Sequence, residues 1–354
     1  MVATRASRVS KLGAVNSSRR FNVAVVGATG VVGQEMLKVL HQRHFPGAEV
    51  RPLASERSRG KKLAYNGSEL EVRVLDQDAF DGIDIALFSA GAGVSREFAP
   101  VAAEAGALVV DNSSAWRLAE NVPLVVPEVN AETIRDNEGI IANPNCCAIP
   151  LAMVVDAIRR RVGIRRVVVA TYQSASGAGR RLVDELHEQT RAIAGGQEPS
   201  ATVYPHQLAY NVVPGGWKPA ADGYNEEEAK IVAETRKILG QPDLKIAVTC
   251  VRVPVPISHG EAVFLETDRP ITPEEAREAF AGAAGIAVQD DYANQVYPTP
   301  AGAAGRDEVF VGRIRQDASV EHGLALWLVS DNLRKGAALN AVQVAECAIE
   351  MGVI

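Results

Sequence analysis

Cys146 is the residue of this chain with the clearest capacity for chemistry. It ends the run Asn143-Pro144-Asn145-Cys146, between an apolar stretch and a segment with helical spacing that begins at Cys147. A thiol at a helix N-terminus feels the positive end of the helix dipole, which favours its thiolate. Backbone N–H groups there can also stabilise an oxyanion beside the sulfur. The run therefore predicts a nucleophile with its own oxyanion site, and a cysteine that only packs is the alternative.

A histidine and an arginine further along the chain are candidate partners for this thiol. His259 follows the strand-like segment Lys245–Val255, and an imidazole can act as general acid or base near neutral pH. Arg252 carries a guanidinium suited to bidentate binding of a carboxylate. Spacing alone leaves a purely structural role open for the histidine.

A glycine loop near the N-terminus indicates a dinucleotide site. The run Gly27–Gly33 (GATGVVG) follows the apolar segment Phe21–Val26 and opens a helical segment. Glycines in this position allow a tight turn and let the backbone approach a pyrophosphate, which the helix N-terminus then binds. Ser89 and Gly91 end another expected strand at the same edge of the sheet, where cofactors lie in such folds.

The residues after the second expected strand favour NADP over NAD. An NAD site has an acidic residue there, on the ribose hydroxyl groups. This chain has Ser55, Arg57 and Ser58, whose side chains suit a 2′-phosphate, although Glu56 lies among them. A solvated, charged loop is the alternative interpretation.

Strand and helix signals alternate from Phe21 onward, and 354 residues are too many for one typical core. The alternation predicts an α/β fold in which a Rossmann-type, doubly wound parallel sheet forms the first domain. The expected strands are Phe21–Val26, Glu49–Ala54, Glu69–Leu75, Asp84–Ser89, Ala107–Asp111 and Gly139–Ala142, and the expected helices are Val31–His44 and Ser95–Ala105.

The pattern changes after Cys146 and predicts an α+β catalytic or dimerisation domain with an open mixed sheet. Its strands are expected at Arg166–Gln173, Lys245–Val255, Glu261–Glu266, Val309–Arg315 and Leu324–Ser330. Its helices are expected at Cys147–Arg161, Gly179–Ala194, Asn225–Leu239 and Pro273–Phe280. We expect a last helix, Leu333–Met351, to return to the first domain, so that residues 21–146 and 331–354 form one domain and 147–330 the other.

The bulk composition excludes several classes of protein. A net charge of −6 does not favour nucleic acid as a partner, and no apolar run is long enough to span a membrane. Four cysteines without a CxxC pair indicate neither a disulfide framework nor a zinc site, so we expect no metal. Residues 1–20 carry five positive charges and no acidic residue, which is typical of a disordered basic tail or of an organelle transit peptide.

Seven motifs occur in an order and spacing that closely resemble the aspartate-semialdehyde dehydrogenase family. They are Gly27–Gly33, Ser55–Lys61, Asp111–Arg117, Asn143–Cys146, Tyr172–Gly177, Arg252–Val255 with His259, and Asp331–Ala338. The resemblance covers about residues 21–354, and it depends on the joint pattern rather than on any one motif.

The resemblance implies a role for each matching residue. Cys146 matches the nucleophile that forms an acyl-enzyme thioester, and His259 matches the acid/base. Gln173 matches the residue that positions substrate near the thiol. Arg252 matches the group that binds the substrate α-carboxylate, and Glu227 matches the acid near its amino group.

Further matches concern phosphate and cofactor. Arg117 and Lys230 match the phosphate-binding residues, and Asn145 is expected to assist the oxyanion site. The implied NADP contacts are Thr29, Gly30, Val31, Val32, Arg57, Ser58, Ser176, Gly177 and Asn332. One departure is Cys147, since the family usually has Ser or Thr after the nucleophile. The neighbours of His259, Ser258 and Gly260, also differ from the usual pairings.

The implied reaction is the reductive dephosphorylation of L-aspartyl 4-phosphate by NADPH, which gives L-aspartate 4-semialdehyde and phosphate. This step belongs to lysine, threonine and methionine biosynthesis. An N-acetylglutamyl-phosphate reductase is the enzymatic alternative, but the Asn143–Cys146 run and the spacing of Arg252 and His259 favour the aspartyl substrate. A catalytically idle nucleotide-binding relative is the second alternative, although all the implied catalytic residues are present.

The expected partners are a small-molecule substrate and a second copy of the chain, as a homodimer or homotetramer. The expected location is the cytoplasm, or an organelle if residues 1–20 are a transit peptide.

Overall fold

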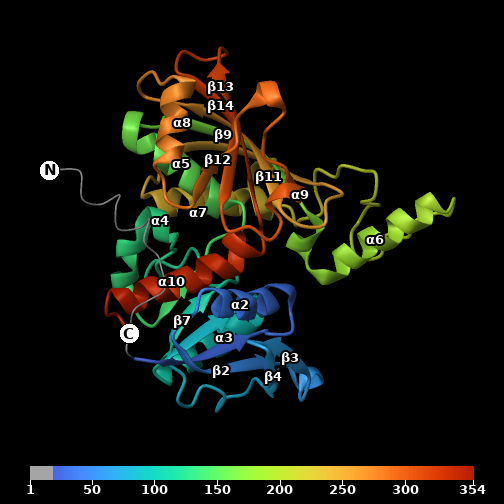
Figure 1. Ribbon diagram of the computed structural model, residues 1–354, viewed down its shortest axis with the longest axis vertical. Helices are drawn as coiled ribbons and strands as arrows, with labels where there is room; N and C mark the ends of the chain where they lie inside the picture. Colours follow the sequence, from blue (N-terminus) through green and yellow to red (C-terminus); the bar gives the residue numbers. More distant parts are fainter. Residues whose placement is uncertain (1–18) are drawn as a thin grey trace. The chain divides into compact units, whose positions relative to one another are not determined.

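The computed structural model describes residues 19–354, so residues 1–18 of the tail expected at residues 1–20 lie outside the described part (Figure 1). The chain forms two compact units. Among the described residues, the first contains 19–145 together with Ala337–Ile354, and the second is Cys146–Gly336. Among residues 19–354, no helix is both long enough and apolar enough to cross a bilayer.

The first unit contains a parallel six-stranded sheet, which confirms the expected Rossmann-type topology. Its strand order is β5-β2-β1-β6-β7-β8, so the chain reverses direction across the sheet at β1. The continuous apolar sequence of β1 suits a strand that is buried on both faces. The strands are β1 (Phe21–Val26), β2 (Gly47–Ala54), β5 (Arg73–Val74), β6 (Ile85–Phe88), β7 (Leu108–Asp111) and β8 (Ile140–Ala142).

The expected strand Glu69–Leu75 was wrong in its extent. The structure has a separate two-stranded hairpin of β3 (Lys62–Tyr65) and β4 (Ser68–Glu71), followed by the short edge strand β5. Asn66 and Gly67 join β3 to β4 with φ values of 49° and 72°. An Asn-Gly pair with positive φ is the favoured two-residue hairpin turn, and it diverts this segment from the main sheet.

The last helix belongs to the first unit. α10 (Leu339–Glu350) has every residue from Leu339 to Ile349 buried, and it contacts α2, β6 and β7. It starts later than expected because a π-helical turn, η6 (Arg334–Ala338), precedes it. The other helical segments of this unit are α2 (Val31–Gln42), α3 (Ala92–Glu104), α4 (Pro127–Asn130), η1 (Glu56–Ser58) and η2 (Ala131–Asp136).

The second unit contains the expected mixed sheet, with strand order β10-β9-β11-β14-β13-β12. β9 pairs parallel with β10 and β12 with β13, while the other neighbours pair antiparallel. The strands are β9 (Arg166–Gln173), β10 (Lys245–Arg252), β11 (His259–Glu266), β12 (Ile286–Val288), β13 (Val309–Asp317) and β14 (Gly323–Ser330). β11 starts at His259 rather than at the expected Glu261, so the histidine is held by strand pairing. The sequence signals missed β12.

Helices of the second unit pack against this sheet. α5 contacts β14, α7 contacts β10, and α8 contacts β12 and β13. Within this unit, Figure 1 shows α6 extending away from the sheet. The helical segments are α5 (Ala148–Val162), α6 (Arg180–Ala194), α7 (Glu226–Leu239), α8 (Pro273–Ala281), α9 (Pro300–Ala303), η3 (Ala175–Ala178), η4 (Ala221–Gly223) and η5 (Tyr292–Asn294).

Candidate active site

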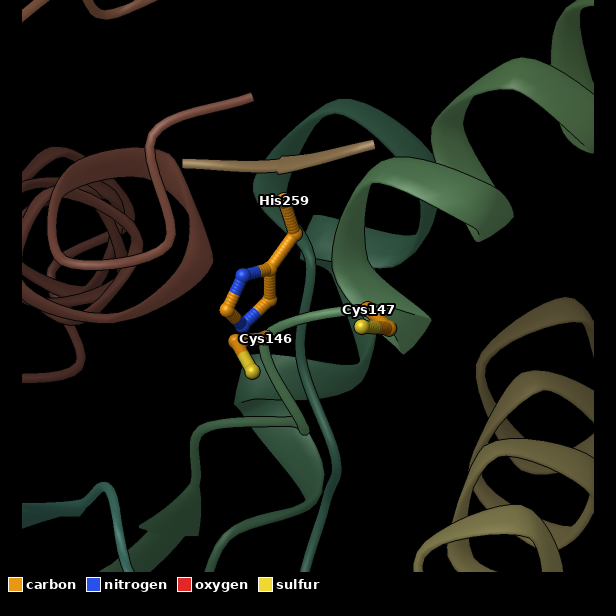
Figure 2. Close-up of side chains that lie close together, drawn as sticks. All are labelled: Cys146, Cys147 and His259. Atoms are coloured by element: carbon orange, nitrogen blue, oxygen red, sulfur yellow. The ribbon is translucent and has the colours of Figure 1, made fainter. Parts of the chain in front are cut away.

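The structure brings Cys146 and His259 together within the second unit. Cys146 directly precedes Cys147, the N-cap residue of α5, and His259 is the first residue of β11. The sulfur atoms of Cys146 and Cys147 and a ring nitrogen of His259 all lie within 4.8 Å of one another. Figure 2 shows the edge of the imidazole far from its Cβ turned toward Cys146. A thiol at a helix N-terminus thus lies beside a histidine, although 112 residues separate them in the sequence.

Hydrogen bonding assigns the tautomer of His259. The backbone N–H of Ser174 donates to Nδ1 over 3.0 Å, so Nδ1 uses its lone pair as an acceptor. A neutral imidazole in this position carries its proton on Nε2. His259 is only 1% exposed, and its Nε2 has no hydrogen-bond partner among residues 19–354. A buried N–H without a partner is therefore available to a substrate atom or to the Cys146 sulfur.

The same three side chains have the donor types of a soft metal site, but the histidine does not fit one. A histidine that binds a metal through one ring nitrogen normally donates from the other. Nδ1 of His259 instead accepts from Ser174. The arrangement suits a thiol–imidazole pair better than a metal centre.

A polar network fixes the position of this histidine. Oδ1 of Asn332 accepts from the Ser258 backbone N–H over 2.9 Å and from the hydroxyl groups of Ser174 and Ser176 over 3.2 and 3.1 Å. The Ser174 hydroxyl lies 3.1 Å from Nδ1 of His259. Ser176 and Asn332, which the sequence assigned to the cofactor, thus bind each other and support the loop beside His259. The sequence analysis did not select Ser174, although it lies in the Tyr172–Gly177 motif.

Arg252 is a buried cation bound to the same residue, Ser174, that hydrogen-bonds His259. It is 2% exposed, its Nη1 donates to the Ser174 carbonyl over 2.7 Å, and its guanidinium lies 4.8 Å from the Trp217 ring. Its Nε has no hydrogen-bond partner among the described residues. A guanidinium fixed in this way, with a donor still available, can bind a carboxylate.

Gly177 leaves a space between Arg252 and His259. A Cβ atom at this position would lie 3.0 Å from Arg252 Nη1 and 3.0 Å from His259 Nε2. Any side chain here would contact both polar groups, whereas glycine places no atom against the two nitrogens. The sequence assigned Gly177 to the cofactor, and its place between these two residues suits the substrate equally well.

Gln173 and Glu227 form a second buried polar pair in this unit. The Gln173 amide donates to Oε1 of Glu227 over 3.4 Å, and the two residues are 1% and 8% exposed. Lys230, three residues after Glu227 on α7, lies 3.8 Å from Glu226, and its side chain is 28% exposed. Glu227 is therefore turned toward Gln173, and Lys230 is a cation at the surface of α7.

Arg117 and Asn145 belong to the first unit. Arg117 donates to the carbonyl oxygens of Asn143 and Asn112 over 3.0 and 2.9 Å, which fixes a largely buried guanidinium. Asn143 in turn accepts from Asn340 of α10 and donates to Asn112, both over 2.7 Å. This network fixes the loop that leads to Cys146, with Asn145 buried within it.

The glycine loop has the close backbone approach that a dinucleotide site needs. Gly27 has φ of 82°, and a Cβ there would lie 2.6 Å from the Ser89 carbonyl oxygen. A Cβ at Gly33 would lie 2.3 Å from the Gly27 carbonyl oxygen. Thr29, Gly30, Val31 and Val32 lead into α2, and Gly91 is the N-cap of α3. Only glycine fits at Gly27 and Gly33, so the expected cradle at the carboxyl edge of the sheet is present.

The loop after β2 carries the residues expected to select the cofactor. Ser55 is the N-cap of η1, Arg57 is exposed, and Ser58 is 7% exposed. Arg59 forms an ion pair with Glu56 over 3.3 Å. The acidic residue of this loop is therefore neutralised by Arg59, and Arg57 extends into solvent beside the sheet edge.

Glu261 is a buried acid that the sequence analysis missed. It is fully buried on β11, and burial raises the pKa of its carboxyl group well above the usual value. Burial also raises the pKa of the Cys147 and Cys250 thiols, which disfavours their thiolates, whereas Cys146 is partly exposed. The signal for Glu261 was its spacing, because residues two apart on a strand share a face, and His259 was already a candidate.

Two family models match the chain. Residues 22–137 match the model for "Semialdehyde dehydrogenase, NAD binding domain", and residues 155–335 match the model for "Semialdehyde dehydrogenase, dimerisation domain". A curated aspartate-semialdehyde dehydrogenase from Aquifex aeolicus is 51% identical over 338 residues, which cover 94% of this chain and 99% of the relative. The chain belongs to the aspartate-semialdehyde dehydrogenase family.

Other aspartate-semialdehyde dehydrogenases agree with this assignment. The Bacillus subtilis relative is 47% identical over 336 residues, covering 93% of this chain and 97% of the relative. The crystal structure of aspartate semialdehyde dehydrogenase II from Vibrio cholerae superposes with a TM-score of 0.90 at 45% identity, over 94% of this chain and 99% of that one. A second structure of the Vibrio cholerae protein, complexed with ASA, has a TM-score of 0.90 at 44% identity, with the same two coverages. The resemblance inferred from seven motifs is confirmed over nearly the whole chain.

Proposed function

We propose that this chain catalyses the NADPH-dependent reductive dephosphorylation of L-aspartyl 4-phosphate through a thioester on Cys146. The observation that carries the proposal is the proximity of the Cys146 sulfur to the His259 ring, within 4.8 Å, at the start of α5. A thiolate, an N–H donor and the N-terminus of a 15-residue helix are the parts that acyl transfer through sulfur requires.

The first half of the reaction uses the thiolate. Cys146 attacks the acyl carbon, and the C–O bond to phosphate breaks as the tetrahedral oxyanion collapses to the thioester. Backbone N–H groups at the start of α5, with Asn145, stabilise that oxyanion. Arg117 and Lys230 neutralise the departing phosphate, and the partly exposed Lys230 is free to adjust to it.

The second half uses the histidine. Bound NADPH would supply the hydride that reduces the thioester. Hydride addition leaves a negatively charged oxygen on the carbon bound to Cys146, and the Nε2–H of His259 donates a hydrogen bond to it. Collapse of this oxyanion breaks the C–S bond, which releases the aldehyde and recovers the Cys146 thiolate. Arg252 binds the substrate α-carboxylate, while Glu227, positioned by Gln173, binds its amino group.

The residues of the first unit fit a dinucleotide, since only glycine can occupy Gly27 and Gly33. Gly27, Thr29, Gly30, Val31 and Val32 are proposed to hold the pyrophosphate, and Ser89 and Gly91 the adjoining part of the cofactor. Ser55, Arg57 and Ser58 are proposed to bind the 2′-phosphate, which selects NADPH. The remaining proposed contacts are Ser176, Gly177 and Asn332.

The proposal also covers the roles of the two units, the oligomeric state and the location of the protein. The unit with the parallel sheet is the NADP-binding domain, and the unit with the mixed sheet is the catalytic and dimerisation domain. Two or four copies assemble, since residues 155–335 match a dimerisation-domain model. A cytoplasmic location stays a prediction, which cell fractionation tests.

Reduction of NADP in the presence of aspartate semialdehyde and phosphate tests the function. The wild-type protein should reduce more than one NADP per site only when phosphate is present, and His259→Ala should slow this turnover by about 10²- to 10⁴-fold. Cys146→Ala should abolish turnover while NADPH still binds, and Cys147→Ser is the control that keeps activity. Turnover by Cys146→Ala at the wild-type rate would overturn the thioester route. Activity with N-acetylglutamate semialdehyde alone would favour the alternative enzyme.

A further inference from the structure

Cys147 has no role in the reaction proposed above, yet its sulfur lies beside the nucleophile. The sulfur atoms of Cys146 and Cys147 and a ring nitrogen of His259 all lie within 4.8 Å of one another (Figure 2). The four cysteines of the chain all lie in the described part, and none of them forms a disulfide. Cys146 and Cys147 are therefore two neighbouring reduced thiols at the start of α5.

The two thiols differ in their access to solvent. Cys146 is partly exposed, whereas Cys147 is 0% exposed. A thiol at a helix N-terminus and beside an imidazole has thiolate character, and a partly exposed thiolate is the form that peroxides oxidise. A small oxidant therefore meets the Cys146 sulfur first, and Cys147 is positioned to react only with what forms on Cys146.

We propose that Cys146 and Cys147 form a reversible disulfide when a peroxide oxidises Cys146, with Cys147 as the resolving thiol. In the first step the Cys146 thiolate attacks one oxygen of hydrogen peroxide and the O–O bond breaks. Cys146 becomes a sulfenic acid, and the other oxygen leaves as hydroxide, which takes up the proton that the thiol had released.

The second step closes the disulfide. The Cys147 sulfur attacks the Cys146 sulfur, the S–O bond of the sulfenic acid breaks, and its hydroxyl group leaves as water with the proton of Cys147. The two thiols together lose two electrons, and one hydrogen peroxide is reduced to two waters. The proposal rests on the proposed function in one respect, which is that Cys146 reacts as a thiolate.

The charges around Cys147 agree with this order of events. Burial is the largest cause that raises the pKa of Cys147, and the charge of Cys146 is a further one. Conversion of the Cys146 thiolate to a neutral sulfenic acid removes that charge. Cys147 therefore keeps its proton while Cys146 is a thiolate, and loses the proton more readily once Cys146 has been oxidised.

The disulfide would join adjacent residues, which makes it easy to form and easy to reduce. The second sulfur is already held beside the first, so little ordering is needed for the attack. Adjacent Cα atoms lie about 3.8 Å apart across a trans peptide, whereas most disulfides span roughly 4.4 to 6.8 Å. The strain in such a bond favours its reduction, and the pair would thus protect Cys146 from irreversible oxidation to the sulfinic acid.

The experiment treats the whole protein with hydrogen peroxide, alkylates the remaining thiols with iodoacetamide under denaturing conditions and measures the masses of the tryptic peptides. Trypsin leaves Cys146 and Cys147 together on peptide 136–159, and Cys250 and Cys347 on two other peptides. In the wild type, peptide 136–159 should lose two hydrogens and take up no iodoacetamide, while Cys250 and Cys347 are alkylated. Dithiothreitol should reverse this change.

Three variants assign the steps. Cys147→Ser removes the resolving thiol, so Cys146 should proceed to the sulfinic acid, and dithiothreitol should then restore about tenfold less activity than in the wild type after the same exposure. In Cys146→Ala, the buried Cys147 should stay reduced. Cys347→Ser is the matched control, because it removes another buried thiol, on α10, and should respond to peroxide as the wild type does.

Three results would overturn the proposal. The first is recovery of Cys147→Ser as complete as that of the wild type. The second is a wild-type peptide 136–159 that carries a sulfinic acid and one alkylated cysteine, or that is not oxidised at all. The third is a disulfide from this peptide to Cys250 or to a second copy of the chain. The masses do not depend on turnover, so the proposal can fail while the thioester mechanism stands, and loss of turnover in Cys146→Ala tests the mechanism separately.

Discussion

The backbone N–H of Ser174 donates to Nδ1 of His259 over 3.0 Å, and this bond defines what the histidine can do. It leaves the proton of the neutral imidazole on Nε2, at the edge that faces Cys146 in Figure 2. His259 therefore approaches the substrate as a hydrogen-bond donor.

The loss of activity on replacing His259 should depend on whether the new side chain still offers an N–H donor. Glutamine presents an amide N–H at about the reach of Nε2, so His259→Gln should keep more activity than His259→Ala, by about tenfold in kcat. Steady-state rates of the two variants, with circular dichroism to verify folding, provide the measurement. Equal loss in both would indicate that proton transfer, rather than donation, dominates.

Gly177→Ala should block the space between Arg252 and His259. The added methyl group would lie 3.0 Å from a nitrogen of each residue, which is closer than ordinary contact. We expect kcat/KM to fall about tenfold or more with little change in melting temperature. Gly215→Ala is the matched control, since a Cβ there meets nothing within 4 Å. Wild-type kinetics in Gly177→Ala would place the substrate elsewhere.

Arg57 should select the cofactor. Arg57→Ala removes a guanidinium proposed to bind the 2′-phosphate, so KM for NADPH should rise about tenfold while KM for NADH stays the same. Arg59→Ala is the control, because Arg59 is also exposed and pairs with Glu56. A parallel change for both cofactors in Arg57→Ala would contradict the assignment.

Stability should depend on pH in opposite directions through two acids. Burial raises the pKa of Glu261 above its usual 4.5, so the folded state holds a proton that the unfolded state releases, and stability falls as pH rises above 4.5. Glu261→Gln should lose this pH-dependent loss of stability. The melting temperature of the variant, relative to that of the wild type, should therefore rise as pH increases.

Glu185 provides the contrasting case. Burial alone would raise its pKa, but N–H groups of Thr202 and Val203, at 2.6 and 2.7 Å, lower it below 4.5 overall. The contribution of Glu185 to the free energy of unfolding is present above pH 4.5 and is lost as pH falls through the pKa of the folded state. Glu185→Gln should therefore lose melting temperature relative to the wild type mainly near neutral pH. The same sign for both variants would contradict these assignments.

The sequence predicted the parts of the site that short motifs specify. Gly27–Gly33 and Asn143–Cys146 depend on local backbone geometry, and their positions at the starts of α2 and α5 could be inferred from residue types alone. The mixed sheet could also be predicted from the sequence, because long apolar strands alternate with amphipathic helices.

The contacts that depend on pairing between distant segments could not be inferred. Ser174 and His259 meet because β11 pairs antiparallel with β9, a register that no local pattern encodes. Glu261 shares a face with His259, yet its carboxyl group could be called unpartnered only once its surroundings were known. Lys230 lies three residues after Glu227 and four after Glu226, and its pairing with Glu226 depends on what α7 packs against.

The most direct test of the account is the mass of the protein after reaction with aspartate semialdehyde and NADP in the absence of phosphate. We predict one NADPH released per site and one aspartyl group bound as a thioester, which peptide mapping locates on Cys146. Addition of phosphate should release the group. An aspartyl group on Cys147, or phosphate-dependent turnover without any acylated cysteine, would contradict the mechanism.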